Sequence, residues 1–472
     1  MKAKLLLLAL VLAGCATPPP IDPAALPVTP AAFKEAGPSP RHSAPGSPRQ
    51  VGDSRAERAL WWTVFQDPVL DDLVTRADRD NASIRVAAAR LAQARALLLQ
   101  ADAERLPQVN ASASAQRGDG FTVTNLPAGH PLTLYGLGAN ASWQADLFGR
   151  LRRASEAASL DAQAAQALLA DTRLVIEADV AQAYLALRAL DEERALVRQT
   201  VGAYRSTLDL TQKRYRAGDV AELDVARAAT QVASTEADAL ALDRRRAQLE
   251  HALAVLVGDA PSDFSIAEVP WSAVLPSIPA GLPSQVLARR PDVAAAQAGM
   301  LAAQARVGAA QAAWFPDIAL TAAGGVASPQ LSDLLKYSTR AWGLGLVAAL
   351  PIFDGGRREA GVRYASGEMD AAVARYRERV LVAFRDVEDQ LAALRLLERQ
   401  GEAEQRAVDA ASRATALSER RWREGLVSQL ELLDAQRSEL ADRRAAVEVK
   451  SARFQATVGL VRALGGGWEG RS

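Results

Sequence analysis

Cysteine and histidine are scarce in this 472-residue chain, and each shortage excludes a class of protein. The one cysteine rules out an intramolecular disulfide. The three histidines, His42, His130 and His251, lie far apart and have no cysteines or carboxylates at metal-ligand spacing. No phosphate-binding loop, nucleophile elbow or dinucleotide fingerprint is present. We therefore expect no enzyme activity, no cofactor and no metal site.

Net charge and long apolar runs are lacking too. Lys plus Arg and Asp plus Glu both number 55 and are interspersed, which argues against nucleic-acid binding and is typical of solvated helix faces. After Leu12 no apolar run reaches the roughly 18 residues of a transmembrane helix. If the chain crosses a membrane, it must do so with strands.

The N-terminal sequence predicts a lipoprotein signal. A short apolar run, 5–12, follows two lysines and ends in Leu-Ala-Gly-Cys, which predicts a signal peptide over 1–14 and lipid attachment at Cys15. The alternative is an ordinary signal peptide with Cys15 incidental. Residues 16–50 then hold ten of the 23 prolines and few large apolar residues, so this stretch predicts an extended tether that packs no core.

An internal repeat organises the rest of the chain. Tyr135-Gly-Leu-Gly recurs as Trp342-Gly-Leu-Gly, and Arg214-Tyr-Arg-Ala-Gly recurs as Arg421-Trp-Arg-Glu-Gly, both at an offset of 207 residues. A period this long indicates a duplicated structural half rather than a solenoid. Each half is predicted as helix, strand, loop, strand, long helix, turn and long helix.

The predicted strands alternate between apolar and polar residues. Residues 109–116 and 137–147 alternate throughout, with weaker copies at 318–322 and 342–350, a pattern typical of strands with one apolar face. A soluble hairpin packed on the helices is the alternative. Four strands cannot close a barrel in lipid, so insertion demands an oligomer: two chains give eight strands and a filled interior, and three give twelve and a conduit.

Long proline-free stretches, 152–216 and 357–423, predict helices of roughly 95–100 Å at 1.5 Å per residue. Paired with 219–257 and 428–464, they make two antiparallel hairpins. Gly218 and Gly425 fit left-handed helix ends, and capping signatures follow them. The predicted tips, Gly218, Asp219, Gly425 and Ser428, suit end-on contact with a partner's helices; the signatures run from Asp219 to Glu222 and from Ser428 to Glu431.

Two carboxylates follow the second tip. Glu431 and Asp434 lie three residues apart on one helix face, and in a three-fold assembly they would form rings of six carboxylates at a cation-attracting entrance. The alternatives are a helix-capping role for Glu431 and a solvated surface position for Asp434.

Several passages resemble the outer membrane factor family, the TolC- and OprM-like channels, in its lipoprotein branch of NodT-type RND efflux proteins. Trp61-Trp62-x-x-Phe-x-Asp-Pro opens the folded part as in family members, and Arg289-Arg290-Pro-Asp-Val is specific to the branch. The duplicated tips and the corner Asp146–Arg150 complete a similarity that covers about residues 60–464.

The resemblance implies a mainly α fold with a transmembrane β-barrel: a homotrimer with twelve strands and a periplasmic α-barrel. It implies a palmitate-bearing lipoprotein of the cell outer membrane that conducts small molecules such as drugs passively from a periplasmic adaptor and an inner-membrane pump. Glu431 and Asp434 match the family's entrance constriction. Asp224 and Trp422 match its closed-state contacts between hairpins; Trp422 replaces the usual tyrosine and Val427 an arginine, so gating here rests more on packing.

The rivals are an exit channel for type I protein secretion and a lipid-anchored coiled-coil scaffold of the periplasm. The lipidation signal Leu-Ala-Gly-Cys, which ends at Cys15, and the Arg289-Arg290 passage favour the efflux branch. The alternating strands argue against the scaffold. The predicted domains are a signal peptide (1–14), a lipidated tether (15–58), a first repeat (59–258; strands 107–117 and 134–148, hairpin 151–257), an equatorial linker (259–283), a second repeat (284–464; strands 317–326 and 340–352, hairpin 357–464) and a tail (465–472).

Overall fold

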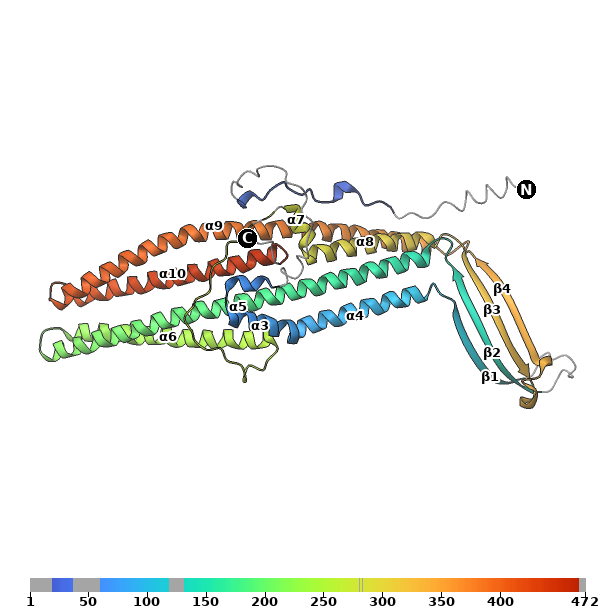
Figure 1. Ribbon diagram of the computed structural model, residues 1–472, viewed down its shortest axis with the longest axis horizontal. Helices are drawn as coiled ribbons and strands as arrows, with labels where there is room; N and C mark the ends of the chain where they lie inside the picture. Colours follow the sequence, from blue (N-terminus) through green and yellow to red (C-terminus); the bar gives the residue numbers. More distant parts are fainter. Residues whose placement is uncertain (1–18, 37–59, 119–130, 280, 282, 467–472) are drawn as a thin grey trace. The chain divides into compact units, whose positions relative to one another are not determined.

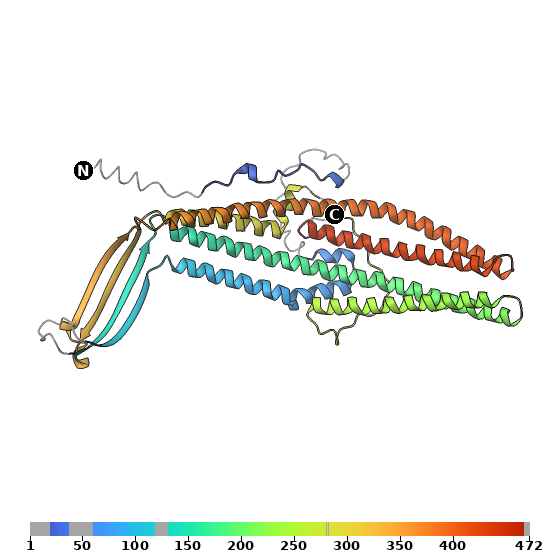
Figure 2. The same ribbon diagram turned by 180° about the vertical axis from the view of Figure 1, so that it is seen from behind.

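The computed structural model describes residues 19–36, 60–118, 131–279, 281 and 283–466 (Figures 1 and 2). Cys15, His42 and His130 lie outside these residues. Within the described residues, three short 3-10 helices come first: η1 (Pro23–Ala25), η2 (Lys34–Ala36) and η3 (Trp61–Phe65). The first half continues with α3 (Pro68–Asp80), α4 (Ala82–Ala103), β1 (Gln108–Gly118), β2 (Leu132–Ala145), α5 (Arg150–Arg216) and α6 (Glu222–Val257).

The second half repeats this order, which confirms the predicted duplication. It consists of α7 (Pro283–Arg289), α8 (Pro291–Ala312), β3 (Asp317–Ser328), β4 (Arg340–Ala349), α9 (Arg357–Arg423) and α10 (Gln429–Ala463), with η4 (Leu331–Asp333) and η5 (Tyr337–Thr339) between the strands. The long helices α5 and α9 are both 67 residues long. No helix among the described residues is long and apolar enough to cross a membrane.

The chain divides into two compact units. The strand unit combines residues up to Pro27 with Ala89–Gln166 and Ala295–Glu378, and it holds the four strands. The hairpin unit combines Val28–Ala88, Ala167–Ala294 and Arg379–Ser472. It holds most of α5 and α9 together with their return helices α6 and α10.

The strand unit contains one antiparallel sheet in the order β1-β2-β3-β4, so β2 and β3 join the two halves. The register places Ala111 opposite Ala139, Ala139 opposite Gly324, and Gly324 opposite Trp342, so all four strands alternate in phase. One face is therefore mainly apolar, with Arg117 and Arg340 at the ends of their strands. Its apolar residues include Val109, Ala113, Leu137, Ala141, Trp143, Ile318, Leu320, Val326, Trp342, Leu344 and Leu346.

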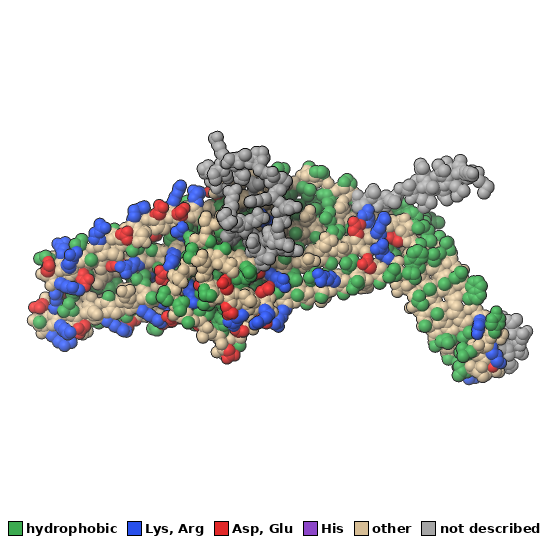
Figure 3. Space-filling model, in the orientation of Figure 1, with side chains coloured by type: hydrophobic (Ala, Val, Ile, Leu, Met, Phe, Trp, Pro, Cys, Tyr) green, Lys and Arg blue, Asp and Glu red, His purple; other side chains and the backbone are tan. Residues whose placement is uncertain are grey.

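The opposite face carries mainly Ser, Asn, Gln, Gly and Ala. The apolar face is largely exposed. Trp342 is 81% and Leu344 77% exposed. In the view of Figure 3 the visible part of the sheet is mostly green (hydrophobic) and tan (uncharged or backbone), and charged side chains gather mainly on the helices. A continuous exposed apolar face of this size marks a surface that needs an apolar partner such as lipid.

Two strand ends differ from the prediction. Leu147 and Leu350 were expected as the last apolar positions of their strands, but β2 ends at Ala145 and β4 at Ala349. The Asp146 carboxylate accepts hydrogen bonds from the backbone N–H groups of Leu151 and Arg152 (3.1 and 2.7 Å) and so begins α5. After β4, Pro351 has no N–H to donate to a ladder, and the strand ends before it.

The main core of the hairpin unit lies where η3 and α3 pack against the middle of α5 and the C-terminal ends of α6 and α10. Trp61 and Phe65 are buried there, with Val180, Tyr184, Leu253 and Phe454 among their neighbours in the core. Asp67 begins α3 by accepting from Val69 and Leu70, and the Tyr184 hydroxyl donates to the second Asp67 oxygen at 2.7 Å. The Trp-Trp-x-x-Phe-x-Asp-Pro passage thus both fills this core and starts the first helix.

A partly buried carboxylate, Glu177, lies at the edge of this core. Trp61 Nε1 donates a 2.8 Å hydrogen bond to Glu177 Oε2. Burial raises the pKa of Glu177 to about 7, with a further upward contribution from Asp78, while the Trp61 hydrogen bond and Arg173 act in the opposite direction.

The proline-rich stretch is more structured than predicted. The expectation that residues 16–50 pack no core was wrong for Phe33, which is 5% exposed and packs in a cluster with Val286, Val387 and Leu460. One aromatic side chain is enough because the bases of α9 and α10 supply the remaining apolar surface.

Candidate functional site at the helical tips

Both helical hairpins turn through the same helix end. At the first tip the Gly218 N–H donates to the Tyr215 carbonyl and the Asp219 N–H to the Arg214 carbonyl (both 2.9 Å). At the second, Gly425 donates to Trp422 and Leu426 to Arg421 (3.0 and 2.8 Å). This pair of bonds defines a Schellman motif, which needs a positive φ, and Gly218 (83°) and Gly425 (76°) have it.

The return helices begin differently. Ser428 caps α10, because its Oγ accepts from the Glu431 N–H at 3.3 Å, as predicted. The signature at Asp219 was wrong: α6 begins at Glu222, its N-cap is Ala221, and Ala221 makes no side-chain cap. The Asp219 N–H is already used to close α5. The repeat offset of 207 equates Ser428 with Ala221, a signal that would have corrected the prediction.

The acidic pair lies on an exposed side of α10. Glu431 and Asp434 are both exposed, whereas Leu432 and Leu433 between them are buried. Their counterparts at the 207-residue offset are Asp224 and Arg227, which form an ion pair at 3.8 Å on α6. The second hairpin therefore carries two carboxylates where the first carries a neutral pair.

Trp422 connects the two hairpins of the chain. It is 5% exposed, and the Arg214 guanidinium of α5 lies 4.7 Å from the centre of its ring. Arg214 also donates to the backbone carbonyls of Trp422 and Arg423 (3.4 and 3.3 Å). Asp224 does not share this contact, since its ion pair is with Arg227 on its own helix. The structure thus brings Trp422 against the other hairpin of the same chain, whereas the ion pair of Asp224 stays within α6.

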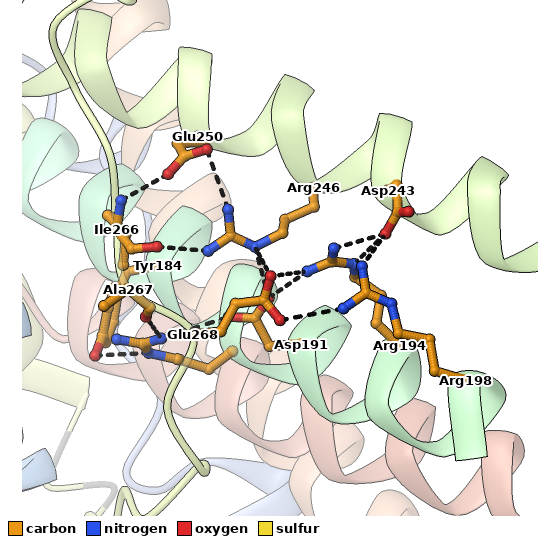
Figure 4. Close-up of polar contacts among 11 residues, drawn as sticks. Tyr184, Asp191, Arg194, Arg198, Asp243, Arg246, Glu250, Ile266, Ala267 and Glu268 are labelled. Carbon is orange, nitrogen blue, oxygen red and sulfur yellow. Dashed lines mark hydrogen bonds and ion pairs between the residues drawn. The ribbon is translucent and has the colours of Figure 1, made fainter.

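Sequence reasoning missed a buried ionic network between α5, α6 and the linker (Figure 4). Asp191 accepts from Arg246 at 2.8 Å and lies 3.3–3.4 Å from Arg188 and Arg194. The side chains of Arg188, Arg194 and Arg246 are only 2, 6 and 11% exposed. The interpretation of interspersed charges as solvated helix faces was wrong here; spacings of three residues among apolar neighbours on α5 were the available signal.

This network fastens the linker to the first hairpin. Arg188 donates to the Ala267 carbonyl at 2.7 Å, and Arg246 donates to the Ile266 carbonyl at 2.6 Å. The Ile266 N–H donates to Glu250 at 2.6 Å. Arg194 and Arg198 together hold Asp243 at 2.6 and 2.9 Å, and their hydrogen bonds and charges lower the pKa of that carboxyl although burial opposes them.

The Arg-Arg-Pro-Asp passage joins three segments of the hairpin unit. Arg290 pairs with Asp292 (2.7 Å) and with Asp386 of α9 (3.2 Å), and it donates to the Ala463 carbonyl of α10 (3.1 Å). A cavity of about 440 Å³ lies beside it, lined also by Asp171. Burial, then the charge of Asp292, raises the pKa of Asp171. No group of three or more metal-binding side chains occurs within the described ranges.

An exposed apolar sheet face, long helical hairpins and a duplicated chain together define a class: an outer-membrane channel protein. The sequence profile of the outer membrane efflux protein family matches residues 73–259 and 282–466, one stretch in each half. The chain belongs to this family, whose members are channel proteins, and its place is the outer membrane.

Relatives match along nearly the whole chain. The outer membrane protein OprJ of Pseudomonas aeruginosa is 33% identical and covers 99% of this chain and 96% of its own length. The pyoverdine export outer membrane protein OpmQ of the same species is 32% identical over 90% of this chain and 92% of its own. The solved outer-membrane channel OprN has a TM-score of 0.85 at 30% identity, covering 96% of this chain and 100% of that one.

Proposed function

We propose that three copies of this chain close a twelve-stranded barrel in the outer membrane and form the exit duct of an RND-type tripartite efflux system. The observation that carries this proposal is the four-stranded sheet. Its apolar face is largely exposed and in phase across all four strands, and among the described residues β1 and β4 each have one edge without a pairing strand. Unpaired edges do not persist in lipid, so β1 of one copy must pair with β4 of the next. Three copies give a conduit, whereas eight strands would fill with side chains.

The same geometry assigns the two sheet faces. The apolar face turns to lipid, and the face of Ser, Asn, Gln and Gly turns to the lumen. Small lumen-facing residues leave the duct open to solutes of different chemistry, which suits passive conduction of small molecules driven by a partner and without catalysis. The name of OpmQ, which exports pyoverdine, supports export of small molecules over secretion of proteins. Lipid attachment at Cys15 remains part of the proposal.

The helical tips are the proposed docking site for a periplasmic adaptor that links the duct to an inner-membrane pump. Two Schellman turns of the same kind give both tips the same shape. Among the described residues, no neighbouring atom lies within 4 Å of where a Cβ would lie on either glycine. Gly218, Asp219, Gly425 and Ser428 therefore offer backbone and small side chains to a partner. We assign Trp422 to the closed-state contact; Asp224 would act only across a contact between copies.

Glu431 and Asp434 are proposed to form the periplasmic entrance constriction. Within the part of the chain that the structure describes, neither forms an ion pair like that of Asp224 with Arg227 in the first repeat. Six uncompensated carboxylates at one level attract cations and bind divalent ions at a narrow entrance.

The entrance assignment is tested with Glu431→Gln combined with Asp434→Asn in planar bilayers. We expect weaker cation selectivity and loss of block by divalent cations added on the periplasmic side. Glu424→Gln, an exposed carboxylate at the same tip, is the matched control and should leave both properties unchanged. Unchanged selectivity and block in the double variant would remove Glu431 and Asp434 from the constriction while leaving the duct itself in place.

A further inference from the structure

Residues 31–36 dock on the base of the second hairpin through an aromatic anchor. Phe33 packs with Val387 of α9 and Leu460 of α10. Its ring meets that of Phe384 edge to face, with ring centres 6.4 Å apart. A buried aromatic side chain is a strong point of attachment for an otherwise extended segment.

Polar contacts fix the direction and register of this segment. The Lys34 and Glu35 N–H groups donate to the two carboxylate oxygens of Glu388 at 2.7 and 2.9 Å. Glu388 thus binds the first N–H groups of η2, which a helix start leaves without partners. The Glu35 carboxylate in turn accepts from Arg395 at 2.6 Å. Phe384, Glu388 and Arg395 are all on α9. This one helix therefore contacts, in order, the Phe33 ring, the Lys34 and Glu35 N–H groups and the Glu35 carboxylate.

On the second hairpin, residues 31–36 occupy the position that the linker occupies on the first hairpin. Arg395 is the counterpart of Arg188 at the offset of 207 residues. Arg188 binds the Ala267 carbonyl of the linker, and Arg395 binds Glu35. The two arginines therefore hold different segments at equivalent positions of α5 and α9, the linker on the first hairpin and residues 31–36 on the second.

The two attachments differ in what holds them. The linker is fixed by the buried network around Asp191 and lies close to the end of α6 in sequence. The segment at 31–36 is held by Phe33 and by contacts at the surface, since the Arg395 side chain is 43% exposed. It is therefore the more readily released of the two.

We propose that residues 31–36 form a releasable clamp on the second hairpin and that Phe384, Glu388 and Arg395 are its seat. While docked, the clamp covers the apolar contact between Val387 and Leu460 and restrains the base of α9 against α10. Its release exposes this contact to water and loosens the base of the second hairpin, with the first hairpin unaffected because the linker holds it.

Hydrogen–deuterium exchange on the full-length protein in detergent tests the clamp. Phe33→Ala should speed exchange at the Lys34 and Glu35 amides at least tenfold, since both are bonded to Glu388 only in the docked state. Exchange should also rise at least threefold in 384–391 and 457–464 but stay unchanged in 177–184, the equivalent stretch of α5. Val28→Ala, at a position that precedes the segment and is 91% exposed, is the control and should change none of these.

A charge exchange separates loss of the clamp from general misfolding. Arg395→Glu should release the segment by like-charge repulsion with Glu35, and Glu35→Arg added to it should restore protection at Lys34 and Glu35. Faster exchange confined to 31–36, with α9 and α10 unchanged, would show a passive segment and overturn the clamp. Unchanged exchange at Lys34 and Glu35 in Phe33→Ala would overturn the seat itself.

Discussion

Replacing Asp191 with Asn is the sharpest test of how the first hairpin is held together. The Asp191 carboxylate is the shared partner of Arg188, Arg194 and Arg246, at distances of 2.8 to 3.4 Å. All three arginine side chains are nearly buried, so water cannot solvate the positive charge that the substitution leaves without its partner. Asparagine has almost the same volume, and the substitution therefore removes charge without creating a cavity.

We expect Asp191→Asn to lower the free energy of unfolding by a large amount for one substitution. Breaking a buried ion pair by removing one partner costs about 3–5 kcal/mol, because the remaining charge is left buried without compensation. Glu250, Asp243 and Glu268 still pair with these arginines, which places the expected loss at the lower end, about 3 kcal/mol. The control, Asp72→Asn, breaks an exposed pair with Arg76 at 3.5 Å and should cost about 0–1 kcal/mol.

The free energy of unfolding is measured by denaturant titration of the detergent-purified protein, followed by far-UV circular dichroism at one detergent concentration. Hydrogen exchange at the Ile266 amide, which donates to Glu250 within the network, reports release of the linker directly. A loss below about 1 kcal/mol for Asp191→Asn, equal to that of the exposed control, would refute the view that burial makes this network decisive.

Three further predictions follow from single positions. Because the folded pKa of Glu177 is raised to about 7, its contribution to stability is present below the unfolded value near 4.5 and is lost as pH rises through 7. Stability of the wild type should therefore fall by about 3 kcal/mol relative to Glu177→Gln between these pH values, as urea midpoints would show; parallel profiles would contradict this. Gly325→Val should prevent trimer formation on native gels, since a Cβ there lies 2.7 Å from the Leu137 carbonyl oxygen, whereas Gly343→Ala, with open space, should not. Gly425→Val should abolish adaptor capture in pull-downs while the trimer persists, because its φ of 76° strains a β-branched residue; Gly202→Ala in α5 is the control, and equal capture by both would show that the tip is not the docking site.

The elements that a local pattern dictates were predictable from the sequence. Alternation of residues produced the two-faced sheet, and the duplicated Arg-aromatic-Arg-x-Gly passages located both Schellman turns. Ser428 was found as a cap because a polar side chain at that position has one local partner, the Glu431 N–H.

Features that depend on contacts distant in sequence were not predictable in this way. Phe33 lies about 350 residues from Phe384 and Val387, so its burial has no local signature. Asp191 looks like any helical carboxylate until α6 brings Arg246 to it. Asp219 was misplaced for a different reason: its side chain suits a cap, but the Schellman turn had already placed it at the end of α5. The predicted bounds of the tether, repeats and tail, and the site roles at the tips, stay predictions.

Single-channel recording of the purified, lipidated protein in planar bilayers, with its mass determined in the same detergent, tests the central claim most directly. The account predicts a mass of three chains and cation-preferring conductance steps, or steps that appear once Trp422 or the entrance carboxylates are substituted. A monomer that never inserts, or a trimer that stays silent in every such variant, would contradict it.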